Sequence, residues 1–203
     1  MELIFIIDTS GSMYSNRIAA VNTALMECIS MIRRNIERSG TQIRVGYMTF
    51  DSKPTSLCYI GDVMNDAFPV FSVKSENGFY ELTRFEAVYD GIIGLSGKSH
   101  TENTGLILIT DGKAIDSMTY QEKLEKAKAL DLFRKAYRFV ACVERDENLW
   151  NREDLDEFAD FRADRIIELS ELATRIDQIC RELTDDRGHE APVTDINRNS
   201  VFD

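Results

Sequence analysis

Two short runs of apolar residues, each ending in an aspartate, constrain the fold more than any other feature of the sequence. Residues 3–7 read LIFII and stop at Asp8, and residues 105–110 read GLILIT and stop at Asp111. A continuous apolar run of this length is typical of a strand buried on both faces, as in a parallel sheet covered by helices. In such sheets, ligands bind at the carboxyl ends of the strands. If the two strands are neighbours, both carboxylates converge on one site.

Helical patterns lie between the apolar runs. Residues 18–36 carry apolar side chains at three- and four-residue steps, which is one face of an amphipathic helix, and Ser39-Gly40 ends the pattern. Further helices are predicted at 62–67, 83–95, 120–135, 152–161 and 170–183. Further strands are predicted at 42–50, 139–143 and 165–168, with an antiparallel edge strand at 56–60. This alternation predicts an α/β fold with a doubly wound, mostly parallel sheet and helices on both faces.

The length and charge of the chain limit what it can bind. With 203 residues it suits one domain, which we place at 1–183, followed by a polar tail at 184–203. Its 24 basic and 35 acidic residues give a net charge of −11, a poor match for nucleic acid or anionic lipid. No segment approaches the roughly 20 apolar residues that span a bilayer. We therefore expect no nucleic-acid partner and no membrane insertion.

The cysteines and the first residues favour a cytoplasmic location. Cys28, Cys58, Cys142 and Cys180 lie far apart in apolar stretches without a CxxC pair, so we expect core thiols rather than a zinc site. The sequence opens with Met1-Glu2 and passes directly into a short apolar run, without the pattern of a signal peptide.

The loop after the first apolar run carries three oxygen-bearing side chains on alternate residues. These are Asp8, Ser10 and Ser12, and in an extended loop alternate side chains point the same way. Hard cations such as Mg²⁺ prefer oxygen ligands in octahedral geometry. Gly11 lets the backbone turn tightly between the two serines. The loop therefore predicts one half of a divalent-cation site.

The run at 6–13, IIDTSGSM, resembles the metal-ion-dependent adhesion site of von Willebrand factor A domains, whose pattern is DxSxS plus a distant Thr and a distant Asp. Asp111, in the sequence LITDG, matches the distant aspartate. Thr83, in ELTRF just before a predicted helix, is the best match for the threonine, although the Gly-Gly-Thr spelling usual in the family is absent. Thr101 and Thr104 are its competitors, but they lie too close to the strand that leads to Asp111.

The resemblance covers residues 1–183 and implies a binding module rather than an enzyme. It implies that Ser10, Ser12 and Thr83 ligate Mg²⁺ (or Mn²⁺) directly, while Asp8 and Asp111 bind through water or exchange with the ligand. An Asp or Glu carboxylate of a protein partner then completes the metal's coordination. Among members of the family, the chain is most similar to compact bacterial cytoplasmic proteins associated with tellurium resistance (TerY-like).

Residues next to these positions are candidates for the rim of the ligand surface. Met13, Tyr14 and Arg17 follow the metal loop, and Arg84 follows Thr83. A Met and a Tyr would give apolar contact around a central charge. Two alternatives stay open: Met13 packs into the core, and Arg84 forms a surface salt bridge of small energetic weight.

Three other interpretations compete with the binding module. A haloacid-dehalogenase-type phosphatase would use Asp8 as nucleophile, but it needs a second aspartate two residues later, where this chain has Ser10. A metal-independent scaffold of the same fold is a second alternative, and an ordinary loop in which Asp8 caps the next helix is a third. His100 and His189 lie in polar stretches, and we expect both on the surface.

Overall fold

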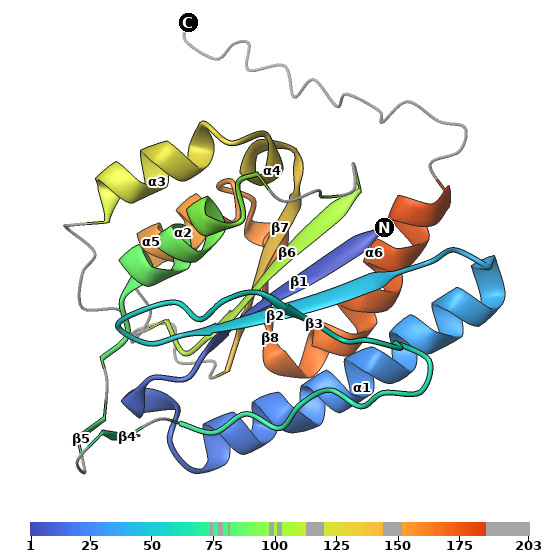
Figure 1. Ribbon diagram of the computed structural model, residues 1–203, viewed down its shortest axis with the longest axis horizontal. Helices are drawn as coiled ribbons and strands as arrows, with labels where there is room; N and C mark the ends of the chain where they lie inside the picture. The colour runs from blue at the N-terminus through green and yellow to red at the C-terminus, as the bar shows by residue number, and fades with distance from the viewer. Residues whose placement is uncertain are drawn as a thin grey trace, which may run out of the picture.

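A computed structural model describes residues 1–73, 75–76, 79–80, 82–97, 100, 103–112, 120–143 and 152–185. Within them, six strands form one sheet in the order β3-β2-β1-β6-β7-β8 (Figure 1). The strands are β1 (Glu2–Asp8), β2 (Arg44–Phe50), β3 (Cys58–Tyr59), β6 (Thr104–Thr110), β7 (Tyr137–Cys142) and β8 (Ile166–Glu168). Neighbouring strands are parallel except β3, which pairs antiparallel with β2 at the edge. The predicted fold class is confirmed.

Helices cover both faces of this sheet. One face carries α1 (Asn16–Ser39) and α6 (Leu172–Asp185), which lie side by side in Figure 1. The other carries α2 (Phe85–Gly94), α3 (Gln121–Lys128), α4 (Asp131–Lys135) and α5 (Arg152–Phe158). Short 3₁₀ turns lie at Gly11–Met13, Ala163–Arg165 and Leu169–Glu171, and β4 (Ser75–Glu76) pairs with β5 (Phe79–Tyr80) in a small hairpin.

The first strand is the centre of both hydrophobic cores. Leu3, Phe5 and Ile7 face α1 and α6, and Ile4 and Ile6 face the opposite helical layer. All five side chains are fully buried, because successive side chains of a strand point to opposite faces and both faces are covered. In the parallel register, Ile7 lies opposite Thr49 of β2 and Ile109 of β6. The ends of β1 and β6 therefore lie next to each other, which meets the condition under which the two carboxylates converge.

The helix predicted at 62–67 is wrong. The segment forms a turn in which the Asp62 carboxylate accepts hydrogen bonds from the Met64 backbone N–H at 3.0 Å and from the Asn65 amide at 2.7 Å. The Asp66 carboxylate in turn accepts the Asp62 N–H at 2.8 Å. Short acidic side chains that bond to nearby backbone groups compete with helix formation. The local side chains therefore stabilise the turn.

The helix predicted at 120–135 is divided into α3 and α4 by an extended residue, Leu130. The break lets the Phe133 ring pack edge-on against Tyr89 and Phe158, with ring centroids 6.1 and 6.0 Å away. The apolar spacing alone did not reveal this break, because it is compatible with one continuous helix.

Glu2 is the centre of a buried polar cluster at the amino ends of the strands. Its carboxylate contacts His100 Nδ1 at 2.9 Å, Arg44 Nη2 at 2.8 Å and the Tyr59 hydroxyl at 2.7 Å. Burial raises the pKa of Glu2, but the contacts with Tyr59 and His100 and the charge of Arg44 lower it below its usual value. His100 is thus half of a buried pair, and its prediction as a surface residue was wrong.

Cys28, Cys142 and Cys180 are buried, as predicted, but Cys58 lies exposed on the edge strand. The predicted tail lies outside the described residues from 186 onward, together with His189, and residues 184–185 belong to α6.

Candidate metal centre

The loop after β1 is fastened to the neighbouring strand. Thr9 donates its backbone N–H and its hydroxyl to the carbonyl oxygen of Phe50, at 2.8 and 3.2 Å. The Met13 N–H donates to the Ser10 carbonyl at 3.0 Å, which closes the short turn at Gly11–Met13. The Met13 side chain is fully buried in the core against α1. Of the two predictions for Met13, core packing is the one that holds, so it is not part of the rim.

Three hydroxyl oxygens from two distant loops meet at this edge of the sheet. Ser10 Oγ lies 3.1 Å from Ser12 Oγ and 2.5 Å from Thr83 Oγ1. Thr83 is 3% exposed and lies two residues before α2. The backbone there is held to the end of β2, because the Arg84 N–H donates to the Asp51 carbonyl at 3.1 Å. The structure therefore brings Ser10, Ser12 and Thr83 together.

The two competitors of Thr83 do not reach this cluster in the described structure. Thr104 begins β6 at the opposite edge of the sheet, where its hydroxyl donates to Glu2 at 3.4 Å. Thr101 lies outside the described residues.

Both predicted aspartates are buried at the same edge. Asp8 accepts the Ser10 N–H at 2.9 Å and the Thr110 hydroxyl at 2.7 Å. Burial raises the pKa of Asp8 to about 6, and the nearby Asp111 carboxylate also raises it, while the hydrogen bonds from Ser10 and Thr110 lower it. Because α1 begins only at Asn16 and the Asp8 carboxylate is bonded within the loop, Asp8 does not cap that helix.

Arg17 reaches into the site from the first turn of α1. Its guanidinium donates to Asp111 Oδ2 at 3.3 Å and to the backbone carbonyl of Ser12. The side chain is 25% exposed, and Asp111 is fully buried. The sequence placed Arg17 only on the rim, because nothing in the local spacing shows that it faces the distant Asp111.

The outer surface of the site carries Tyr14 and Arg84. Tyr14 is 61% exposed, and Arg84 is also exposed. Both positions are compatible with the predicted rim of a ligand surface.

The donors in this cluster restrict the kind of ion that fits. Within the described ranges, no group of three or more His, Cys, Asp or Glu side chains is arranged to hold a metal. A cation here would therefore depend on hydroxyl oxygens as well as on the two carboxylates. Such an all-oxygen set suits Mg²⁺ or Mn²⁺, whereas zinc sites in proteins are usually built from Cys and His.

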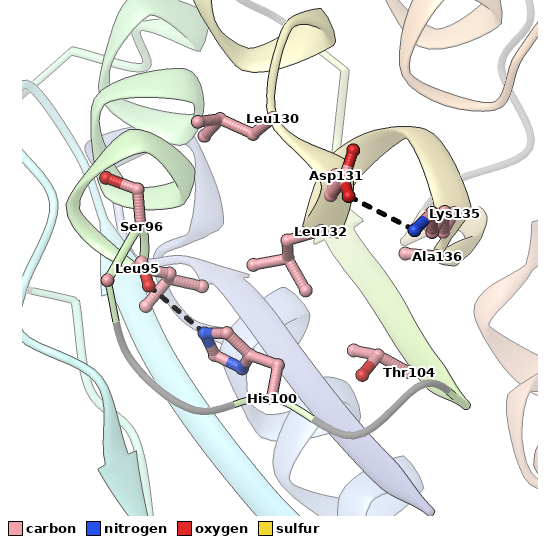
Figure 2. Close-up of a pocket in the computed structure, with 10 residues that line it drawn as sticks. Leu95, Ser96, His100, Thr104, Leu130, Asp131, Leu132, Lys135 and Ala136 are labelled. Carbon is pink, nitrogen blue, oxygen red and sulfur yellow. Dashed lines mark hydrogen bonds and ion pairs between the residues drawn. The ribbon is translucent and has the colours of Figure 1, made fainter.

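A separate cavity of about 350 Å³ lies near the amino ends of the strands (Figure 2). Leu95 and Leu132 line it with apolar surface, and His100 and Thr104 lie on one side. Both ring nitrogens of His100 are engaged, by Glu2 and by the Leu95 carbonyl at 3.1 Å. This geometry fits a structural role for His100.

The strand order reverses between β1 and β6, which makes this edge the switch point of a doubly wound sheet. Polar loops at such a point form the ligand-binding edge of Rossmann-like proteins. The family model for the von Willebrand factor type A domain matches residues 2–179, and the chain belongs to that family. Its members are typically protein-interaction modules. No curated protein matches the chain.

Solved structures support the same fold at low sequence identity. An aerotolerance-related membrane protein from Bacteroides fragilis NCTC 9343, with multiple mutations to serines, is 13% identical with a TM-score of 0.59, covering 91% of this chain and 99% of that one. BatB from Bacteroides thetaiotaomicron is 15% identical with a TM-score of 0.56, at the same coverage of 91% and 99%. The pilus adhesin SpaC from Lactobacillus rhamnosus GG, in its open conformation, is 12% identical with a TM-score of 0.57, covering 91% of this chain but 30% of SpaC.

In the described part of the chain, no helix has the length and apolar character to cross a membrane.

Proposed function

We propose that this domain is a divalent-metal-dependent module that captures an acidic residue of a partner protein. Ser10, Ser12 and Thr83 would bind Mg²⁺ (or Mn²⁺) directly, and Asp8 and Asp111 would bind it through water or exchange with the ligand. The observation that supports this best is the meeting of the three hydroxyl oxygens, with 2.5 Å between Ser10 Oγ and Thr83 Oγ1.

The charge at the site explains why a carboxylate is the expected ligand. Two buried carboxylates contribute −2 and the Arg17 guanidinium +1, so the protein groups alone sum to −1. A bound divalent cation would supply a Lewis-acidic centre and bring the sum to +1. Neutral hydroxyl ligands leave most of that charge available to an incoming anion. Asp and Glu side chains of a partner provide such an anion.

Calorimetric titration with Mg²⁺ alone tests the metal site. Thr83→Val removes one hydroxyl but keeps the β-branched shape, and we expect it to weaken Mg²⁺ binding at least tenfold, or about 1.4 kcal/mol. Thr9→Val is the matched control, because the Thr9 hydroxyl points to Phe50 and the Thr9 N–H keeps that carbonyl bonded. Equal Mg²⁺ binding by wild type and Thr83→Val would show that the assignment of Thr83 is wrong.

Capture of a partner is tested by co-purification from the native cell in buffers with Mg²⁺ or EDTA. Partners of the metal site should be lost in EDTA. In Mg²⁺ they should co-purify with the Thr9→Val protein but not with the Thr83→Val protein. Partners retained under all conditions would support the alternative of a metal-independent scaffold. The cytoplasmic setting and the link to tellurium resistance that the resemblance implies are further proposals. Growth of a deletion strain on tellurite would test the link to tellurium resistance.

A further inference from the structure

Two largely buried guanidinium groups share a single carboxylate beside strands β7 and β8. Arg138 on β7 and Arg165 before β8 have side chains that are 8% and 12% exposed. Asp160 lies 3.2 Å from Arg138 and 4.0 Å from Arg165, and its own side chain is 60% exposed. The guanidinium planes also contact aromatic rings, with Arg138 4.1 Å from Phe133 and Arg165 4.6 Å from Tyr137. The three groups together carry an excess positive charge.

The hydrogen bonding of these arginines is incomplete. The Nε–H groups of Arg138 and Arg165 are buried, and neither has an acceptor among the described residues. A buried donor without an acceptor costs stability, and the cost is larger for a charged group. Burial lowers the pKa of Arg138, and the charge of Arg165 lowers it further, against the opposing effect of Asp160. An anion beside Arg138 would offset the cost of burying its charge.

The turn that carries Asp160 is strained. Asp160 and Phe161 both have positive φ angles, 62° and 54°, although neither is a glycine. Two consecutive side-chain-bearing residues in this region of backbone space cost of order 1–3 kcal/mol each, and such strain gathers at ligand sites. The conformation places the Asp160 carboxylate beside the arginines and leaves the Phe161 ring 68% exposed.

A cavity of about 320 Å³ opens at this turn. Arg138, Lys128 and Arg134 line it, together with Glu157 and Asp160. Lys128 pairs with Glu125 at 2.9 Å and Arg134 pairs with Asp131, so the uncompensated positive charge is that of the two arginines that share Asp160. Glu157 is partly occupied elsewhere, because it accepts the Tyr120 hydroxyl at 2.8 Å. The volume is at the lower end of the range for small-molecule sites and exceeds what a bare inorganic anion needs.

We propose that this cavity binds the phosphate group of a small organic phosphate monoester. The planar guanidinium of Arg138 lines the cavity and can direct its Nη–H groups to phosphate oxygens, as arginine does at phosphate sites. Lys128 also lines the cavity, where its charge, although paired with Glu125, adds attraction for an anion. The exposed Phe161 ring provides apolar contact for the organic part. The site lies at the amino end of β7, away from the candidate metal centre, and is independent of it.

Titration with phenyl phosphate tests this site in EDTA and at constant ionic strength, with binding followed by calorimetry. We expect phenyl phosphate to bind saturably and more tightly than inorganic phosphate. Phe161→Ala should lower the affinity for phenyl phosphate to that for inorganic phosphate and leave the affinity for inorganic phosphate unchanged. Lys128→Gln should weaken binding about two- to fivefold, as for a partly exposed charge pair. Arg138→Lys keeps the charge but loses the planar guanidinium with its paired Nη–H donors, and should weaken binding about tenfold or more.

Lys126→Gln is the matched control, because it makes the same charge change on the same helix, at an exposed residue paired with Glu122 and outside the cavity lining. Its binding should equal that of wild type. If wild type shows no saturable binding, or if Lys126→Gln weakens binding as much as Lys128→Gln, the proposal is overturned. Should Arg138→Lys fail to fold, the two lysine variants and Phe161→Ala still decide the question.

Discussion

Arg17→Gln should raise the affinity of the domain for Mg²⁺ and lower its capture of an acidic partner. The Arg17 guanidinium lies 3.3 Å from the Asp111 carboxylate and also donates to the Ser12 carbonyl. It therefore competes with a cation for Asp111 and repels that cation as well. Removing its charge makes the empty site more negative and the loaded site less positive. The two affinities should consequently change in opposite directions.

The magnitude follows from the distance and the burial of the pair. Two unit charges at this separation interact by about 1.3 kcal/mol in water and by about 2.5 kcal/mol at an effective dielectric constant near 40. Arg17 is a quarter exposed and Asp111 is fully buried, so a value between these limits is reasonable. An effect of about 1.3–2.5 kcal/mol corresponds to an increase in Mg²⁺ affinity of about 9- to 70-fold.

The assay is calorimetric titration with Mg²⁺ at low ionic strength, repeated at high salt. Arg34→Gln is the control, because it removes the same charge from an exposed position on the same helix, two turns or more from the site. A loss of Mg²⁺ affinity in Arg17→Gln, or a change no larger than in Arg34→Gln, would refute the electrostatic argument. The second readout is the amount of partner that co-purifies in the presence of Mg²⁺. If Arg17→Gln recovers more partner than wild type, the argument that the loaded site becomes less positive is wrong.

Three further predictions concern the core, the buried acid and catalysis. Met13→Ala should lower the free energy of unfolding by about 2–4 kcal/mol in a urea titration, whereas Tyr14→Ala should change it by less than about 0.5 kcal/mol. Glu2→Gln should lower the free energy of unfolding by about 2 kcal/mol at neutral pH. Because the pKa of Glu2 is lowered in the folded protein, this difference should shrink as the pH falls through that pKa. A difference that does not depend on pH would contradict the prediction. Phosphate monoester hydrolysis should be absent, and robust turnover that disappears in Asp8→Asn would favour the phosphatase alternative.

The fold was predictable because the buried strands are recognisable as continuous apolar runs in the sequence. The runs that end at Asp8 and Asp111 are apolar up to their last residues, which is typical of strands in a sheet covered on both faces. The alternation with helices indicated parallel strands joined by right-handed connections, whereas the order of the strands came from the structure.

Interactions that the apolar spacing does not reveal explain the errors in the predicted helices. The side chain of Asp62 stabilises a turn, although its neighbours look compatible with a short helix. The break at Leu130 is fixed by where Phe133 packs, and that partner is distant in sequence.

The candidate site was predictable only where its members follow recognisable strands. Asp8 ends β1 and Asp111 directly follows β6, and Ser10 and Ser12 lie in the loop after Asp8. Thr83 depended on the family resemblance, and its closeness to Ser10 comes from the way α2 is held against β2. Arg17 faces Asp111 across 94 residues of sequence, a relation that no local pattern records.

The two edge strands of the sheet affect whether the domain can add strands from other molecules. On one side β3 has two residues, and on the other β8 has three. A short border exposes few backbone donors and acceptors, so it is a poor template for adding a strand from another molecule. Self-association into extended sheets is thereby discouraged, and a partner must recognise side chains and loops instead. The described edges of the sheet therefore offer little backbone for polymerisation.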